Sequence, residues 1–291
     1  MSSGAGRYAP SPSGPLHLGN LRTALLAWLS ARSRQARFVL RIDDLDQQRC
    51  RPEHEAGQLA DLAALGVTFD AEPLRQSTRS QRYAAAVRAL EAAGSVYPCW
   101  CTRADLRDAA SAPHGAPPQH RPGTCVPTER PPALRINAGG ATVAFADRHR
   151  GPQLGVVEDA VVQRADGTCA YHLATVLDDH DQGVTEVVRG EDLLDATATQ
   201  LWLIGRLGLT RPEYAHVPLV LNAAGQRLAK RDGAVTLADR IALGETPEQV
   251  IGWLAASVGL ADTGEALSAK QVLARYDPAT FTPPPSGPLP S

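Results

Sequence analysis

The 291-residue sequence has no hydrophobic run long enough to cross a bilayer, and its first six residues lack the apolar segment of a secretory signal. We therefore expect a cytoplasmic protein with no membrane partner. Cysteine is also scarce, with five residues scattered along the chain. An odd and scattered set argues against a disulfide framework and favours free thiols or a metal site.

A strong charge of one sign is lacking as well. The chain carries 29 Lys+Arg residues against 31 Asp+Glu residues, a formal net charge of −2. This balance excludes a protein that binds nucleic acid through a generally positive surface. Any RNA contact must come from local basic patches, and four arginines along one predicted helix are candidates: Arg75, Arg79, Arg82 and Arg88. A solvated helix face is the favoured interpretation of these four.

Lysine is nearly absent, because only Lys230 and Lys270 stand among the 29 basic residues. Lys230 lies in the basic segment Arg227-Leu-Ala-Lys-Arg231. In a chain that otherwise uses arginine, this lysine indicates a need for a compact ammonium rather than a planar guanidinium.

An extended segment stiffened by prolines runs from Arg7 to Asn20 and leads into a helix predicted over 21–34. The first turn of this helix carries His17 and Gly19. A helix start presents free N–H groups and about half a positive charge, so it suits a triphosphate. Together with the Lys230 segment, it predicts a site that activates a carboxylic acid with ATP.

The rest of the sequence alternates between helix and strand patterns, which is typical of an α/β protein with a doubly wound sheet. Its length and 43% hydrophobic content suit one large domain with an insertion, or two modest domains. An insertion of irregular structure is predicted from Cys99 to about Pro132, and disorder in the proline-rich stretch 281–291. The predicted helices are Glu53–Leu65, Ser80–Ala93 and Ala196–Leu207. The predicted strands are Phe38–Ile42, Ala133–Asn137, Thr142–Phe145 and Val217–Leu221, with a hairpin turn at Ala165–Thr168.

Six segments together resemble the glutamate branch of the class I aminoacyl-tRNA synthetases. His17-Leu-Gly-Asn20 resembles the HIGH signature, and the Lys230 segment resembles the KMSKS loop. Four more segments resemble glutamyl-tRNA synthetases: Arg7–Gly14, Leu40–Asp46, Asp178–Thr185 and Val188–Asp192. Because the matches run in order over residues 7–231, the set is more specific than either signature alone.

The resemblance implies a class I aminoacyl-tRNA synthetase catalytic domain over 1–240, a Rossmann-like parallel sheet with helices on both faces. It also implies a zinc-bearing insertion at about 99–149 and a short helical C-terminal part at 241–280. Full-length glutamyl-tRNA synthetases continue into an anticodon-binding domain, which we do not expect here. The short form resembles paralogues that attach glutamate to the queuosine base in the anticodon of tRNA(Asp).

The function so implied is that of a ligase, expected to be a monomer. It would form glutamyl-adenylate from ATP, Mg²⁺ and L-glutamate, and then esterify queuosine in tRNA(Asp). Two alternatives stay open. A truncated discriminating glutamyl-tRNA synthetase would charge the 3′ end of a tRNA, and a non-catalytic paralogue would bind tRNA or an adenylate. The set of His17, Gly19 and Lys230 favours an enzyme.

The resemblance assigns the catalytic residues His17, Gly19, Asn20 and Lys230, with Arg227 added for ATP binding. His17 and Gly19 would meet the phosphates and adenosine, and Lys230 would stabilise the departing pyrophosphate from a closing loop. Asn20 replaces the last histidine of HIGH, and Arg227 replaces a lysine but keeps its charge. Taken alone, His17 would be a locally hydrogen-bonded helix-terminal residue.

The same resemblance assigns a glutamate pocket to eight residues: Arg7, Tyr8, Ala9, Pro10, Ser11, Asp43, Tyr171 and Arg189. Arg7 would bind the side-chain carboxylate, and two arginines suit a doubly anionic substrate. Asp43 would accept the α-ammonium where the family carries a longer glutamate. Asp44 and Asp46 could form a metal pair, but a solvated cluster with Arg41 and Arg49 nearby is the favoured interpretation.

Three cysteines of the insertion, Cys99, Cys101 and Cys125, suit a structural zinc, which takes four tetrahedral ligands. The resemblance supports this, although the position of a tyrosine ligand falls on Arg121. His120 is the candidate fourth ligand, with His114 or water as alternatives, and three free thiols are the alternative to a metal. Cys50 and Cys169 are expected to be unpaired.

Overall fold

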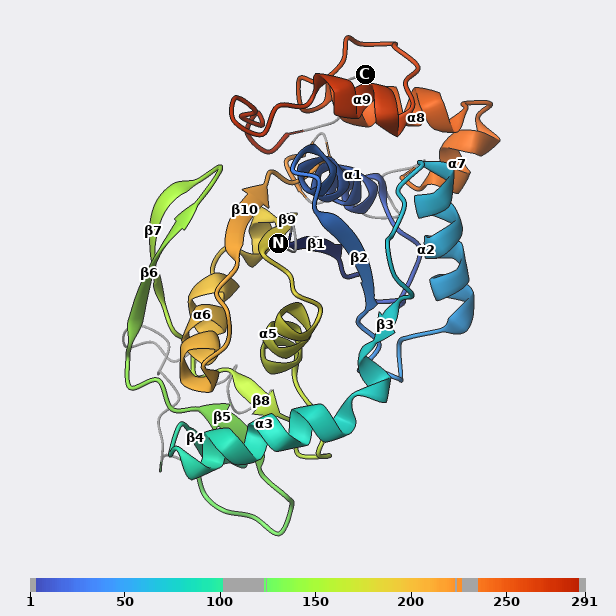
Figure 1. The fold of residues 1–291 in the computed structure, drawn as a ribbon. Helices are drawn as coiled ribbons and strands as arrows, with labels where there is room; N and C mark the ends of the chain where they lie inside the picture. Colours follow the sequence, from blue (N-terminus) through green and yellow to red (C-terminus); the bar gives the residue numbers. More distant parts are fainter. Residues whose placement is uncertain (1–3, 102–122, 124, 223, 227–234, 288–291) are drawn as a thin grey trace.

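The computed structural model describes residues 4–101, 123, 125–222, 224–226 and 235–287, and its elements are labelled in Figure 1. The strands are β1 (Ala5–Tyr8), β2 (Arg37–Ile42), β3 (Leu74–Arg75), β4 (Val96–Cys99), β5 (Ala133–Ile136), β6 (Thr142–Asp147), β7 (Gly151–Val156), β8 (Val161–Gln163), β9 (Glu186–Gly190) and β10 (Glu213–Val217). The helices are α1 (Leu18–Ser33), α2 (Pro52–Ala64), α3 (Ser80–Ala92), α5 (Tyr171–Asp181), α6 (Ala196–Leu207), α7 (Leu237–Ala242), α8 (Pro247–Ala256) and α9 (Ala269–Arg275), with short 3-10 turns η1 (Gln76–Thr78) and η2 (Glu191–Leu193).

Parallel strands form the centre of the fold. β1, β2 and β3 pair in parallel in one sheet, and β9 and β10 pair in parallel in another. The two sheets meet at β1 and β9, where the Thr185 N–H donates to the Ala5 carbonyl at 2.9 Å. β6 pairs in parallel with β10, and β7 forms an antiparallel edge on β6. The expected parallel sheet is confirmed, with this edge in addition.

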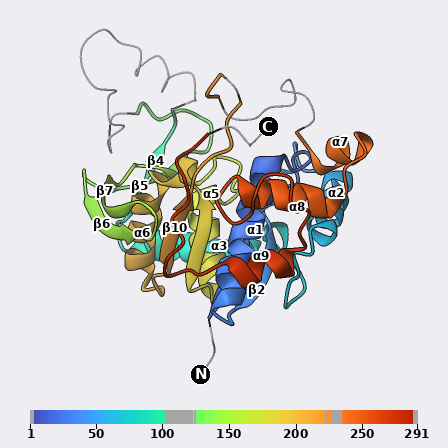
Figure 2. The same ribbon diagram turned by 90° about the horizontal axis from the view of Figure 1, so that it is seen from above.

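Helices cover both faces of the sheet, as Figure 1 and Figure 2 show. On one face α1 packs with α8 and α9, so that Leu25 and Leu254 belong to one hydrophobic core. On the other face α3, α5 and α6 form a second core, which contains Tyr83, Leu173 and Leu203. Among the helices in the described part of the chain, none has the length and apolar character that a bilayer crossing requires.

Local signals set the helix boundaries that the sequence predicts. α2 starts at Pro52. N–H groups in the first turn of a helix have no acceptor within the helix, so the N–H that proline lacks costs no hydrogen bond there. Gly208 ends α6 with a φ of 63°, a conformation that glycine adopts without strain. The helix predicted over Ala196–Leu207 has the bounds of α6.

Several expectations are wrong in detail. The strand predicted over Val217–Leu221 is instead β10, which ends at Val217 because Pro218 has no N–H to continue the ladder. The hairpin at 165–168 is reduced to a turn closed by one bridge between Gln163 and Cys169. No prediction was made for α5, β7 or β9.

Residues 281–287, for which we expected disorder, lie against the segment that follows β10. Gly287 forms a parallel bridge with Val220, and its carbonyl accepts from the Leu221 N–H at 2.9 Å. The Ser286 hydroxyl accepts from the Leu219 N–H at 2.6 Å. The proline-rich segment cannot form a long ladder, but backbone and hydroxyl groups between its prolines still form hydrogen bonds with 219–221.

Candidate active site

A cavity of about 420 Å³ lies between the end of β1, the start of α1 and the end of β9. Predicted site residues from distant parts of the chain line it: Arg7, Tyr8, Ala9, Pro10, Ser11, His17, Gly19, Asn20, Asp43, Tyr171 and Arg189. Every predicted glutamate or ATP residue in the described ranges is therefore on one cavity. Arg227, Lys230 and Arg231 lie outside those ranges.

His17 is the N-cap of α1. Its Nδ1 accepts from the Asn20 N–H at 3.1 Å, and Asn20 Oδ1 accepts from the His17 N–H at 3.2 Å. This capping box gives Asn20 a structural reason to replace the histidine of the HIGH signature. A Cβ at Gly19 would lie 3.0 Å from the His17 ring and 3.3 Å from Val220. Close packing at the helix start therefore favours glycine.

Residues on both sides of the Lys230 segment lie beside this helix start. Val220 lines the cavity. The Leu18 N–H donates to the Val235 carbonyl at 2.7 Å, and His17 forms an antiparallel bridge with Thr236. The chain thus passes the start of α1 both before residue 227 and after residue 234.

Arg7, on β1, is buried but keeps part of its guanidinium available. Its Nε–H donates to Asp179 Oδ1 at 3.3 Å, and its Nη1 donates to the Val188 carbonyl at 3.1 Å. Arginine has five N–H groups, so three of those of Arg7 have no partner among the described residues. Burial lowers the pKa of Arg7, an effect that Asp179 opposes. Its remaining donors can bind a carboxylate through two hydrogen bonds.

Arg189, on β9, is held much more tightly. Its Nε–H donates to His216 Nε2 at 3.0 Å, and its Nη1 donates to Gln200 Oε1 at 2.7 Å. Its Nη2 donates to Thr197 Oγ1 at 2.9 Å and to the Leu193 carbonyl at 3.2 Å. Four of the five N–H groups are therefore used, and a ligand could receive one. The two arginines of the sequence prediction are not equivalent.

His216 and Asp147 form a buried pair behind Arg189 that the sequence did not reveal. His216 Nδ1 lies 2.6 Å from Asp147 Oδ2, and neither side chain is exposed to solvent. Because His216 Nε2 accepts from Arg189, the ring proton resides on Nδ1 and is donated to Asp147. Burial lowers the pKa of His216, which keeps the imidazole neutral. The pair fixes the acceptor that orients Arg189.

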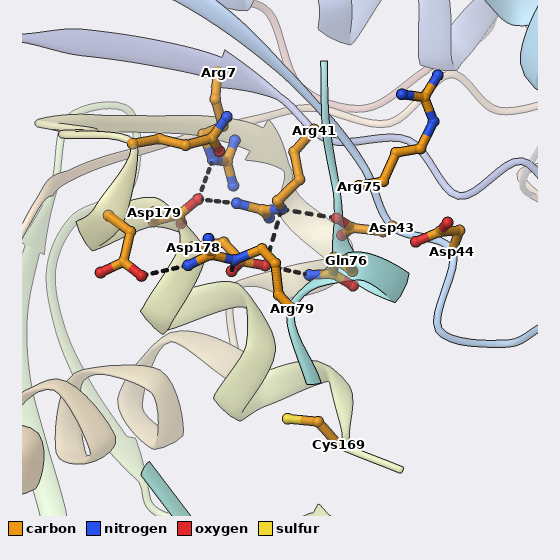
Figure 3. Close-up of polar contacts among 12 residues, drawn as sticks. Arg7, Arg41, Asp43, Asp44, Arg75, Gln76, Arg79, Cys169, Asp178 and Asp179 are labelled. Atoms are coloured by element: carbon orange, nitrogen blue, oxygen red, sulfur yellow. Dashed lines mark hydrogen bonds and ion pairs between the residues drawn. The ribbon is translucent and has the colours of Figure 1, made fainter. Parts of the chain in front are cut away.

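Asp43 belongs to a buried ion network, shown in Figure 3, that includes Arg7. Arg41 donates from Nε to Asp43 Oδ1 at 2.7 Å and also pairs with Asp179, which in turn pairs with Arg7. Burial raises the pKa of Asp43, and Arg41 opposes the rise. The interpretation of Arg41 as part of a solvated cluster is wrong, since its exposed fraction is 1%.

Asp44 and Asp46 do not form a metal pair. Asp44 accepts from the backbone N–H and the hydroxyl of Ser77 at 2.8 and 2.6 Å. Asp46 pairs with Arg49 at 2.8 Å. The only group of metal-binding type found among the described residues is the cysteine cluster.

The four arginines considered for RNA binding do not share one helix. Arg75 is in β3 and pairs with Glu55, whereas Arg79 precedes α3 and pairs with Asp178 and Asp181. Arg82 also pairs with Asp181. Only Arg88 matches the interpretation of a solvated helix face, since it is exposed.

Cys99, Cys101 and Cys125 converge at the base of the insertion, where β4, β5 and β8 form a small antiparallel sheet. Their Sγ atoms lie within 4.8 Å of one another, with 3.4 Å between Cys101 and Cys125. Thiolates on a tetrahedral zinc stand roughly 3.8 Å apart, given Zn–S bonds of about 2.3 Å. The three thiols therefore fit zinc. His114, His120 and Arg121 lie outside the described residues, and Cys50 and Cys169 are free thiols away from this cluster.

Comparisons with known proteins agree with this geometry. The family model for the catalytic domain of class I tRNA synthetases (E and Q) matches residues 5–272. A protein of Nocardia farcinica named glutamyl-Q tRNA(Asp) synthetase is 52% identical over 287 residues, 95% of this chain and 90% of that protein. A Symbiobacterium thermophilum protein of the same name is 46% identical, over 94% of this chain and 92% of that protein. The crystal structure of a glutamate tRNA ligase from Elizabethkingia meningosepticum, in complex with its amino acid, has a TM-score of 0.84 at 26% identity and covers 98% of this chain and 67% of that chain.

Proposed function

Since the chain belongs to the family of class I tRNA synthetase catalytic domains for glutamate and glutamine, we propose that it activates L-glutamate with ATP and transfers the glutamyl group to the queuosine base of tRNA(Asp). The observation that carries the proposal is the 52% identity to a protein named for this activity, over 90% of that protein's length. The cavity that joins Arg7, Asp43 and Arg189 to the start of α1 supports the same chemistry.

L-Glutamate would be recognised by side chains that differ in the number of hydrogen bonds they can still form. Arg7 has three N–H groups left and would bind the side-chain carboxylate through two of them. Arg189 would add one N–H and its charge, and Tyr171 would form the wall beside the methylenes. Asp43, already held by Arg41, would accept the α-ammonium, with a water filling the length that an aspartate lacks relative to glutamate.

In the activation step, an α-carboxylate oxygen attacks the α-phosphorus of ATP, and the bond from that phosphorus to the bridging oxygen of pyrophosphate breaks. The start of α1, with His17 and Gly19, would bind the phosphates. Lys230 and Arg227 would neutralise the departing pyrophosphate, and Mg²⁺ bound to ATP supplies further charge compensation. The passage of the chain past α1 on both sides of 227–234 supports this assignment.

In the transfer step, a queuosine hydroxyl oxygen attacks the carbonyl carbon of the adenylate. A carbon–oxygen ester bond forms, the bond from that carbon to the AMP oxygen breaks, and the hydroxyl proton passes to solvent. AMP leaves as the second product. We also assign a structural zinc to Cys99, Cys101 and Cys125, with His120 as the fourth ligand, because three converging thiols at the base of the insertion suit that ion.

The test compares transfer of labelled glutamate to tRNA from cells that make queuosine and from cells that do not. Label confined to the queuosine-containing tRNA is the expected result. Equal label on both would mean conventional charging of the 3′ end. Absence of glutamate-dependent ATP–pyrophosphate exchange in folded protein would refute activation itself.

A further inference from the structure

A second and larger cavity lies beside the first. Its volume is about 880 Å³, against about 420 Å³ for the cavity that contains Arg7. Three segments wall it: the loop 45–49 after β2, the stretch from η1 into α3, and the turn 163–169 before α5. No residue assigned above to glutamate or ATP lines it.

Two short segments, 43–45 and 169–171, lie at the boundary between the two cavities. Asp43 lines the first cavity, and Leu45, two residues later, lines the second. Tyr171 lines the first, and Cys169 lines the second. A substrate with its ammonium on Asp43 carries its α-carboxyl group on the neighbouring carbon. The carbonyl that an acceptor must attack therefore lies near this dividing wall.

Buried polar contacts also run through the wall. Gln76, on the second cavity, donates to Asp178 at 2.9 Å, and Asp178 lies 3.9 Å from Arg41 on the first. In Figure 3, Arg7 and Cys169 stand at opposite ends of this group of residues. These contacts hold the boundary between the two cavities in place, with one ligand expected on either side of it.

The lining of the second cavity combines an apolar floor with a polar rim. Tyr83 and Val87 are buried within it, whereas Gln47 and Gln48 are exposed at its edge. The side-chain amides of both glutamines have no hydrogen-bond partner among the described residues, and Arg164 forms no ion pair there. Amides supply donors and acceptors for the edge of a nucleobase, and a guanidinium plane can stack on its face.

We propose that the second cavity binds the acceptor nucleoside, a purine-like base that carries a hydroxylated ring, and that its hydroxyl reaches the activated glutamate at the boundary where 43–45 and 169–171 pass from one cavity to the other. This inference rests on the proposed function. The charges of the lining balance, with Arg49 and Arg164 against Asp46 and Asp166, so the cavity suits a neutral base better than a phosphate group. Its volume leaves room for the ring in addition to the base.

The test separates transfer from activation. In Gln47→Ala/Gln48→Ala, kcat/KM for the queuosine-containing tRNA should fall by about tenfold to a hundredfold, since two base-reading amides are lost. Glutamate-dependent ATP–pyrophosphate exchange should match wild type. Gln81→Ala is the matched control, because Gln81 is an exposed glutamine on α3 that does not line the cavity. Free queuosine nucleoside should inhibit transfer in the wild type but not exchange.

A filling variant provides an independent arm. Ala84→Trp places a bulky ring in the cavity and should also reduce transfer while exchange, which reports a folded active site, persists. Normal transfer in both variants would overturn the inference, and so would an equal loss of exchange and transfer. Lack of exchange in the wild-type protein would instead overturn the proposed function.

Discussion

Replacing Asp147 by asparagine tests how the active site holds Arg189. Asp147 Oδ1 accepts from the backbone N–H groups of His149 and Arg150 at 3.0 Å each and of His216 at 3.3 Å. Its Oδ2 accepts from the same His216 N–H at 3.1 Å and receives the His216 Nδ1 proton at 2.6 Å. An asparagine is expected to keep its oxygen at the Oδ1 position, because the opposite orientation would direct an amide N–H at three backbone donors instead of one. Its NH₂ group then faces His216.

That orientation reverses the tautomer of His216. The ring must now accept at Nδ1 and carry its proton on Nε2, which points at the Arg189 Nε–H from 3.0 Å. Two opposed donors in a buried site cost about 1–3 kcal/mol. Arg189 must turn away to relieve the opposition, so its contact with glutamate is weakened. The expected result is a rise in KM for glutamate of about fivefold to a hundredfold.

Glutamate-dependent ATP–pyrophosphate exchange measures this effect, with KM for ATP expected to remain unchanged. Asp159→Asn is the matched control. Asp159 also accepts from one side chain and one backbone group, the Tyr97 hydroxyl and the Ala138 N–H at 3.0 Å each, but it does not line the cavity. If Asp147→Asn keeps the wild-type KM for glutamate and merely loses thermal stability as the control does, the tautomer argument is refuted.

Three further outcomes are expected. Burial, with a smaller effect of Arg189, lowers the pKa of His172 to about 4 from its usual 6.5. Between pH 6.5 and about 4 the unfolded chain therefore binds a proton at His172 that the folded chain does not, so the free energy of unfolding falls by up to about 3 kcal/mol as the pH drops through that interval. Thermal melts at a series of pH values should show a smaller loss of stability in His172→Gln, and a loss equal to that of the wild type would contradict the assignment. Zinc chelation or Cys125→Ser should lower the melting temperature while Cys50→Ser does not, and equal melting temperatures throughout would exclude a stabilising metal. Lys230→Ala should slow pyrophosphate exchange by about a hundredfold to a thousandfold with little change in calorimetric glutamate binding, and full exchange would remove Lys230 from the mechanism.

The sequence predicts those features whose causes are local. The periodic pattern of α6 and the glycine after it define that helix within one segment, and the capping residues of α1 are three positions apart. The resemblance adds most of the predicted cavity residues, because all of them except Tyr171 fall in short contiguous signatures. Where one residue interrupts an apolar pattern, the prediction fails: Pro218 ends β10 at Val217, whereas the apolar pattern of 217–221 predicted a strand there.

Features that depend on distant residues were not predictable in the same way. Asp147 and His216 are 69 residues apart, and Arg41 and Asp179 are 138 apart. Asp147 and His216 lie in none of the matched segments, and the segments that contain Arg41 and Asp179 do not indicate that these two residues pair, since an aspartate and an arginine in a sequence are most often solvated. Only the parallel pairing of β9 and β10 brings Arg189 opposite His216. The number of Arg189 N–H groups left for a ligand could therefore be counted only once the register of β9 and β10 was known.

The charges around the cavity do not by themselves distinguish glutamate from glutamine. Arg7, Arg41 and Arg189 contribute three buried cations, whereas Asp43 and Asp179 contribute two anions. Asp192 also lines the cavity, so the charges of these described residues cancel, while Asp178 is balanced separately by Arg79 at 2.7 Å. Selection against glutamine therefore depends on the N–H groups of Arg7 that remain available. The amide N–H groups of glutamine would face them, and the buried donors left unpaired would cost about 1–3 kcal/mol.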